Sequence, residues 1–205
     1  ATANYLPFVF STDDTALVEI TDSNVRVWVS DSLITRGAVS SAVTNGTFDA
    51  DVASWTDADE AGGTSAWVTG GYMGLTGNGT AAAIRRQQVT VGASAQGDEH
   101  ALRIVIQRGP VTLKVGSSAG TDDYISETEL MTGTHSLAFT PSGNFHIEFS
   151  SRKKRQVLVD SCAVEGSGVM AITAPWLAAD LSKVRFDQSG DVLFIACEGY
   201  QQRRI

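Results

Sequence analysis

The alternation of apolar and polar residues, broken by turn residues, most constrains what this chain folds into. Segments such as Ala83–Val91, His100–Gln107 and Asn144–Ser151 follow period two, and stretches with a helical period are almost absent. Because successive side chains of a strand point to opposite faces, this period predicts strands rather than helices. Glycine, with 20 copies in 205 residues, supplies most of the turn signals between them. The sequence therefore predicts an all-β protein.

Composition and charge exclude several classes of protein. No apolar run approaches the roughly 18 residues that a membrane helix needs, and the N-terminal ATANYLPF lacks the charged and apolar regions of a signal peptide. We therefore expect no membrane insertion. The net charge of −8 argues against tight nucleic-acid binding, because that affinity comes mainly from Lys and Arg neutralising phosphates.

The spacing of the strand patterns divides the chain into three segments. The first holds three short patterns up to Ser30, after which small and polar residues run from Leu33 to Ala42. From Asn45 to about Glu165 six or more strands recur between Gly-rich or acidic turns, which predicts a β-sandwich. A short helix after Pro175 and a hairpin with its turn at Ser189–Asp191 follow.

The two end segments are each too small to bury a core alone. We therefore expect residues 1–40 and 168–205 to form one discontinuous β-meander unit, with residues 41–167 inserted as a complete sandwich. Cys162 and Cys197 fall in different units, so two reduced, buried thiols are expected rather than a disulfide.

Five short motifs in the inserted segment occur in a characteristic order. They are Asn45-Gly46-Thr47-Phe48-Asp49, Trp55-Thr56, Gly71-Tyr72-Met73-Gly74-Leu75, Gln87-Gln88-Val89 and Val157-Leu158-Val159-Asp160. Together they resemble the landmarks of galactose-binding-like domains, including family-four carbohydrate-binding modules. The resemblance implies a jelly-roll β-sandwich. Phe48 and Trp55 would supply large apolar area to the space between its sheets.

The same resemblance implies candidate binding residues. Sugar-binding members use exposed aromatic platforms with nearby polar groups, which here would be Trp67, Tyr72 and Tyr124, with Arg85 or Arg86 as hydrogen-bond donors. The alternative is that Trp67 and Tyr72 serve core or edge packing.

Many of these modules also hold a structural Ca²⁺, and Asp49 and Asp160 stand at the matching positions. The alternative is that Asp49 caps a turn and Asp160 is a solvated edge residue. No other cofactor is expected.

The two ends of the chain resemble a different family. The residues concerned are Leu6-Pro7-Phe8, Thr15 to Ile20, Pro175-Trp176, Asp180-Leu181 and Gln188-Ser189-Gly190-Asp191-Val192. They resemble the opening region of bacteriophage and prophage tail proteins, especially tubular or nozzle proteins of short tails. The resemblance implies the N-terminal part of a longer structural protein. It would assemble with other tail subunits in the bacterial host cytoplasm, reside in the virion tail and present its insert to a host-surface glycan.

The state of the two ends distinguishes this hypothesis from its rival. Pairing of Gln188–Ile205 with Leu6–Val29 in one sheet would support the tail protein. Disordered ends would favour a carbohydrate-binding module of a larger secreted or surface protein.

Catalysis is not expected from the sequence. His100, His135 and His146 lie in strand patterns, with no Cys or second His at zinc-ligand spacing, and are expected on strand surfaces. Two acidic clusters resemble the carboxylate pairs of glycosidases but fall in polar, turn-rich stretches typical of solvated loops. They comprise Asp57, Asp59, Glu60, Asp122, Asp123, Glu127 and Glu129. A glycosidase-type depolymerase using these loops is the third hypothesis.

One basic run interrupts the acidic chain at Arg152, Lys153, Lys154 and Arg155. Four consecutive cations are suited to an anionic surface, such as lipopolysaccharide phosphate or an acidic neighbouring subunit. The alternative is a solvated hairpin tip that also opposes aggregation.

Overall fold

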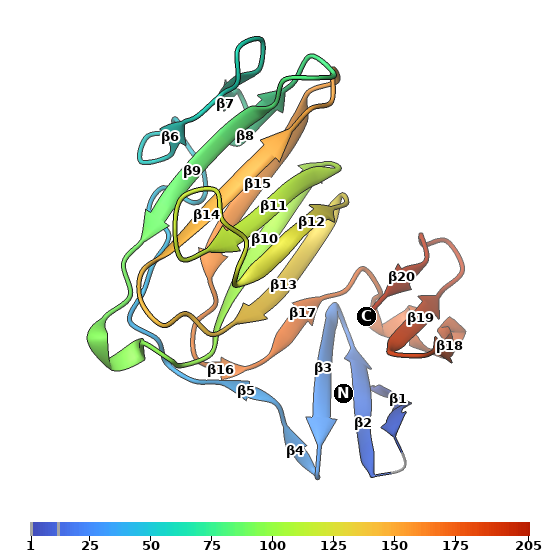
Figure 1. Cartoon of the computed structure of the whole chain (residues 1–205). Coiled ribbons are helices and arrows are strands. Elements are labelled where there is room, and N and C mark those ends of the chain that lie inside the picture. The colour runs from blue at the N-terminus through green and yellow to red at the C-terminus, as the bar shows by residue number, and fades with distance from the viewer. Residues whose placement is uncertain (1, 12) are drawn as a thin grey trace. The chain divides into compact units, whose positions relative to one another are not determined.

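The computed structural model describes residues 2–11 and 13–205 and confirms an all-β protein (Figure 1). Two 3-10 helices, η1 (Ala93–Ala95) and η2 (Ala178–Lys183), accompany the strands. The chain divides into two compact units, Ala1–Arg36 with Gly168–Ile205, and Gly37–Ser167. The first boundary falls after Arg36 rather than after residue 40. Among the residues that the structure describes, no helix is long and apolar enough to cross a membrane.

The discontinuous unit contains an antiparallel sheet of the order β1-β2-β3-β17, with β4 paired to β3. Its strands are β1 (Asn4–Ser11), β2 (Asp14–Thr21), β3 (Asn24–Val29), β4 (Ser32–Leu33) and β17 (Ala171–Thr173). A short pair follows, in which β5 (Thr35–Arg36) binds β16 (Gly168–Val169). Strands from both chain ends therefore build this unit.

A second sheet of the same unit comes from the C-terminal segment. Its order is β18-β19-β20, with β18 (Arg185–Ser189), β19 (Val192–Ala196) and β20 (Arg203–Arg204). Gln188–Ile205 and Leu6–Val29 therefore lie in different sheets, and the one-sheet pairing that would have supported the tail protein is not found. Pro7 lies in the edge strand β1 and has no N–H for a further strand, which disfavours a continuous ladder.

The two sheets share one apolar core instead of a hydrogen-bonded ladder. Its buried members are Leu6, Val18, Ile20, Val25, Ala174, Trp176, Leu181, Val184, Leu193, Ile195 and Cys197. Side chains that the two end segments could not bury separately are thus buried together.

The inserted unit is a sandwich of two antiparallel sheets (Figure 1). One has the order β13-β10-β15-β8-β7, with β13 (Gly133–Phe139), β10 (His100–Arg108), β15 (Val157–Val164), β8 (Tyr72–Thr76) and β7 (Thr64–Val68). The other has the order β12-β11-β14-β9-β6, with β12 (Ile125–Leu130), β11 (Val111–Gly116), β14 (Phe145–Ser151), β9 (Ala83–Val89) and β6 (Thr56–Asp57). The sandwich core draws buried side chains from both sheets.

The loop Val43–Thr56 completes this core, as expected from its aromatic residues. Phe48 and Trp55 are 0% and 2% exposed, and their ring centroids lie 5.7 Å apart. Gln87, on the inner face of β9, fixes the loop because its amide donates to the carbonyls of Thr44 and Ser54 at 2.8 and 3.1 Å. The two cysteines are free and buried, which confirms the expectation for both thiols. Burial raises the pKa of the Cys162 thiol.

Candidate functional site

A groove of about 780 Å³ lies on the outer face of the sheet β12-β11-β14-β9-β6. Residues of β9, β11 and β14 form its floor, and they alternate with core residues of the same strands, which places them on the outer face. The floor residues are Ile84, Arg86, Thr112, Lys114, Glu148 and Ser150. Glu60, Gly79 and the segment Arg152–Lys154 border it. All of these residues belong to the inserted unit.

A charged row crosses the groove floor from strand to strand. Arg86 of β9 pairs with Glu148 of β14, which pairs with Lys114 of β11. Directly paired residues share a face, so the three side chains adjoin. The Arg86 Nε lies 2.5 Å from a Glu148 carboxylate oxygen, and the Lys114 Nζ lies 2.8 Å from Glu127 of β12. Next to this row, Ser150 and Thr112 form a hydroxyl-bearing row.

The charged side chains of the floor are largely buried. The Glu148 side chain is only 7% exposed and the Arg86 side chain 32%. The hydrogen bond to Glu127 raises the pKa of Lys114 above its ordinary value, outweighing the opposite effect of burial. The groove floor therefore consists of paired charges, Arg86 with Glu148 and Lys114 with Glu127.

The structure separates the four residues of the basic run. Arg152, Lys153 and Lys154 line the groove. Arg152 lies 3.7 Å from Glu60, and Lys153 lies 3.8 Å from Glu129. By contrast, Arg155 donates to the Gly109 carbonyl at 3.0 Å, which ties the end of the run to the β10–β11 turn.

The three predicted aromatic residues are not brought together. In the β7–β8 hairpin, Trp67 pairs with the core residue Met73, and Tyr72 pairs with Val68. Because Met73 and Tyr72 are adjacent in β8, the side chains of Trp67 and Tyr72 lie on opposite faces of the sheet. The Trp67 indole donates to the Phe48 carbonyl at 2.7 Å. Trp67 thus anchors the loop Val43–Thr56, as in the packing alternative.

Tyr124 belongs to the other sheet, just before β12. Its ring stacks on Phe139 with centroids 6.0 Å apart, and its hydroxyl lies 3.1 Å from that of Ser142. None of the three predicted aromatic residues is among the described residues that line the groove.

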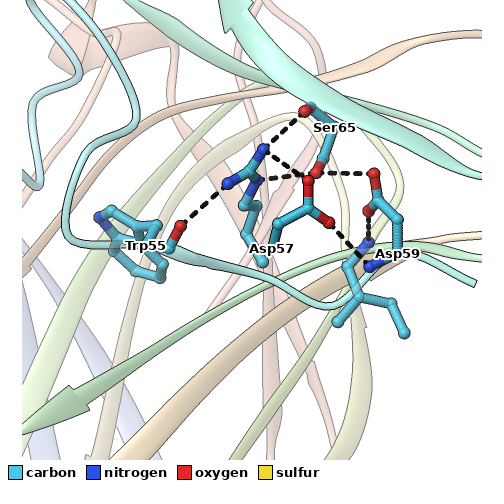
Figure 2. A network of polar contacts seen from close by, with 6 residues as sticks. Trp55, Asp57, Asp59 and Ser65 are labelled. Atoms are coloured by element: carbon cyan, nitrogen blue, oxygen red, sulfur yellow. Dashed lines mark hydrogen bonds and ion pairs between the residues drawn. The ribbon is translucent and has the colours of Figure 1, made fainter.

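The two predicted arginines have different positions. Arg86 lies in the groove, whereas Arg85 pairs with the core residue Phe149 and points to the inner face. The Arg85 guanidinium, 13% exposed in its side chain, donates to the Ser65 hydroxyl at 2.7 Å, the Ser65 carbonyl at 2.8 Å and the Trp55 carbonyl at 3.0 Å. Arg85 therefore joins the segment at Trp55 to β7, and Figure 2 shows the residues Trp55 and Ser65 that it connects.

The first acidic cluster belongs to the same network. Asp57 accepts a hydrogen bond from Arg85 at 3.2 Å, and Asp59 accepts from the Ser65 hydroxyl at 3.0 Å (Figure 2). Glu60 accepts from the backbone N–H of Ala82 at 2.7 Å. These carboxylates hold the β6–β7 segment against β9, while Asp57 and Glu60 stay exposed to solvent, as expected from the sequence.

The second acidic cluster is split between a turn and a strand. Asp123 closes the turn, because it accepts hydrogen bonds from the Thr121 hydroxyl and the Ser117 N–H, which lower its pKa to about 2. Asp122 accepts from the N–H of Glu127. Glu127 and Glu129 lie in β12, where they border the groove.

The Ca²⁺ expectation does not fit the side chains present. Asp49 is exposed and binds the Thr47 hydroxyl at 2.8 Å, while Asp160 lies 3.4 Å from the Ser161 hydroxyl. Among the described residues, no group of three or more His, Cys, Asp or Glu side chains is placed to hold a metal ion.

Oxygen atoms do converge nearby, but an amide satisfies them. The Asn45 side-chain nitrogen lies 2.7 Å from an Asp51 carboxylate oxygen, 3.0 Å from the Ala53 carbonyl and 3.2 Å from the Asp51 carbonyl. The Asn45 amide thus donates to all three of these oxygens.

No histidine is among the described residues that line the groove, and the position of His100 corrects the sequence interpretation. His100 is 1% exposed, with its Nδ1 3.0 Å from the Asp98 carbonyl and its ring against Phe139 and Phe145, so it is a core residue and not a surface one.

The sequence had indicated Arg86 and the basic run, but not Glu148, Lys114, Thr112 and Ser150, which only the strand register brings together.

No protein-family model and no curated protein matches this chain.

Proposed function

We propose that this chain is part of a bacteriophage or prophage tail protein. The unit built from both chain ends assembles with other tail subunits, and the inserted sandwich presents its groove to a host-surface glycan. The observation that carries the proposal is the pairing of β5 with β16, Thr35 with Val169 and Arg36 with Gly168. The chain leaves the end unit and returns to it at adjacent positions, which suits a domain inserted at a loop tip.

The residues that carry the tail-protein resemblance support this proposal. Leu6, Trp176 and Leu181 belong to the core of the end unit, and Gln188 hydrogen-bonds the backbone of Val9. The motif residues from the two ends thus share one core and are joined by hydrogen bonds, so the ends form a packed unit. The ends do not pair in one sheet, but they are packed and not disordered, which argues against a carbohydrate-binding module with linker strands.

Strand order supports a jelly roll as the finer description of the sandwich. Strands β8 to β15 contribute the orders β13-β10-β15-β8 and β12-β11-β14-β9. Consecutive strands lie in opposite sheets, with β11–β12 as the exception, an arrangement that suits eight strands in two four-stranded sheets.

The groove supports a recognition role for the insert. It has a volume of about 780 Å³ and offers hydroxyl groups and paired charges as hydrogen-bonding partners. The same groove would serve the rival carbohydrate-binding module, so binding and assembly need separate tests.

Binding is tested by screening the whole chain on an array of bacterial surface glycans. The double variant Thr112→Gln, Ser150→Gln fills the groove floor, and Thr134→Gln, Ser136→Gln places the same groups on the outer face of the other sheet as a control. We expect loss of binding in the first variant alone. Absence of binding across the array would refute the recognition role.

Assembly is tested by antibody labelling. Antibodies against residues 37–167 are expected to mark the tails of particles released by the bacterium that encodes the chain, as seen by electron microscopy. Tails that stay unlabelled while the protein is detected elsewhere would refute the tail assignment.

A further inference from the structure

We infer that the groove recognises an anionic saccharide, held by the cations Arg152, Lys153 and Lys154 at its border. The inference rests on the proposed recognition role and specifies its ligand class. It follows from the lining of the groove, from its local charge and from the difference between its floor and its border.

The lining lacks the groups that neutral sugars need. Proteins hold neutral sugars largely by stacking the apolar face of the ring on an aromatic side chain. Among the described residues that line the groove none is aromatic, and Ile84 and Pro110 are its larger apolar members. Affinity must therefore come from polar and charged contacts.

Local charge gives the groove its preference. Five cationic and four carboxylate side chains line it, so it carries one net positive charge, whereas the whole chain carries −8. A cationic concave surface on an acidic protein concentrates anions from solution. Each carboxylate of the lining pairs with one cation: Glu148 with Arg86, Glu127 with Lys114, Glu60 with Arg152 and Glu129 with Lys153. The excess charge is therefore that of Lys154, at the border.

The border cations form long, exposed ion pairs, and Arg152 also donates to the Thr80 carbonyl at 3.0 Å. The ion pairs Arg152–Glu60 and Lys153–Glu129 measure 3.7 and 3.8 Å, and the two cationic side chains are 64% and 54% exposed. Exposed ion pairs of this kind contribute little to stability. A ligand anion can replace the carboxylates at small cost, so these cations are available for binding.

The floor behaves in the opposite way. Arg86 and Glu148 form a short pair with the carboxylate almost fully buried, so the floor does not release its charges. Its fixed polar groups and the Thr112 and Ser150 hydroxyls suit the hydroxyl groups of a sugar backbone. The floor would thus orient the saccharide and the border would bind its acidic substituent.

Sugars carry negative charge as carboxylates or as phosphates, and the border cations suit both. The test therefore measures, by calorimetry, binding of an oligogalacturonate and of a phosphorylated lipopolysaccharide core oligosaccharide to the whole chain. Each is compared with its neutral counterpart, the methyl ester or the dephosphorylated form. Polyglutamate serves as an anionic chain without sugar.

A double variant assigns the binding to the border. Lys153→Gln, Lys154→Gln removes two charges from the groove, and Lys183→Gln, Arg204→Gln removes two from the other unit as a control. We expect at least one charged saccharide to bind, a roughly ten-fold or greater loss for its neutral form, and a similar loss in the groove variant alone. Both variants should keep the melting temperature of the parent chain.

The outcomes distinguish the preference for anionic saccharides from the proposed glycan recognition on which it rests. Equal binding of charged and neutral forms overturns the inference and leaves the recognition role intact. Equal loss in the control variant, or equally tight binding of polyglutamate, also overturns it, because charge alone would then explain the affinity. Absence of binding to every saccharide, charged or neutral, overturns both.

Discussion

The side-chain amide of Gln188 binds both backbone polar groups of Val9, although 179 residues separate them. Its Nε2 donates to the Val9 carbonyl at 2.6 Å, and its Oε1 accepts from the Val9 N–H at 3.0 Å. The amide thereby imitates the backbone of a neighbouring strand. It satisfies the free edge of β1, an edge that would otherwise offer a pairing site to another chain.

Gln188→Ala is expected to destabilise the unit formed by the chain ends by about 1–3 kcal/mol, because two backbone groups of an edge strand lose their partner. Urea unfolding followed by tryptophan fluorescence, to which Trp28 and the core residue Trp176 of this unit contribute, measures the effect. Gln202→Ala, an exposed glutamine near the chain end, is the matched control. A loss no larger than that of the control would contradict the structural role of Gln188.

Trp67→Phe is expected to lower the free energy of unfolding of the sandwich by about 0.5–1.5 kcal/mol, because it removes the indole donor to the Phe48 carbonyl. Tyr72→Phe, in the partner strand of the hairpin, is the control and should have a smaller effect. Neither change should alter glycan binding in the groove. Reduced glycan affinity in the Trp67 variant would restore the aromatic-platform hypothesis.

Trp67 and Tyr72 also show what the sequence could not supply. Period-two alternation predicted most of the long strands, because alternation is a local property of each strand. Whether two residues share a face depends on the register of pairing, here Trp67 with Met73 and Tyr72 with Val68. That register is set by the turn between the strands and by the core, and not by the residues themselves.

Acidic strands and the groove were missed for a related reason. Ile125–Leu130 contains Glu127 and Glu129 and was expected to be a solvated loop, yet it pairs with β11 at the sheet edge, where its outer face is exposed to solvent. The floor pair Arg86 and Glu148 is 62 residues apart in sequence and meets only through the pairing of β9 with β14. The sequence shows that these residues are charged, but it does not show which of them form ion pairs, because that depends on the pairing of the strands.

Arg85→Lys is expected to cost about 1.5–3 kcal/mol of sandwich stability, because an ammonium group cannot reproduce the planar set of donors that reaches Ser65, Trp55 and Asp57. Thermal unfolding by circular dichroism measures the change. Arg108→Lys, an exposed position on β10, is the control. Equal melting temperatures for the two variants would show that the network in Figure 2 does not hold the β6–β7 segment.

Stability of the end unit should depend on pH through Glu19. Burial acts to raise the pKa of this carboxyl, but hydrogen bonds from Trp28 at 2.9 Å and Arg26 at 3.0 Å outweigh it and hold the pKa below its ordinary value of 4.5. The folded state therefore binds this proton more weakly than the unfolded state. The stabilisation is complete above the unfolded pKa and is lost as pH falls through the folded pKa.

The free energy of unfolding, measured by urea titration from pH 7 down to pH 3, should fall more steeply in the parent chain than in Glu19→Gln. Asp22→Asn, an exposed acid at the β2–β3 turn, is the control and should keep the parent slope. Parallel curves for the parent chain and Glu19→Gln would contradict the lowered pKa.

Calcium should be without effect on the parent chain, because the Asn45 amide already satisfies the oxygens of Asp51 and Ala53. Asn45→Asp would set a carboxylate among these oxygens and is expected to cost roughly 1–3 kcal/mol. The resulting cluster of carboxylate and carbonyl oxygens suits a hard cation. Ca²⁺ should therefore restore part of the lost melting temperature in this variant alone.

Differential scanning fluorimetry in excess Ca²⁺ and in EDTA compares the parent chain, Asn45→Asp and the control Asn78→Asp. Asn78 acts through its side-chain oxygen, which accepts from the N–H groups of Thr80 and Ala81, so an aspartate there keeps both bonds. A parent chain that melts earlier in EDTA would mean that a cation, and not Asn45, organises the loop Val43–Thr56. An unchanged parent with a Ca²⁺-responsive Asn45→Asp would establish that the amide fills the position of the ion.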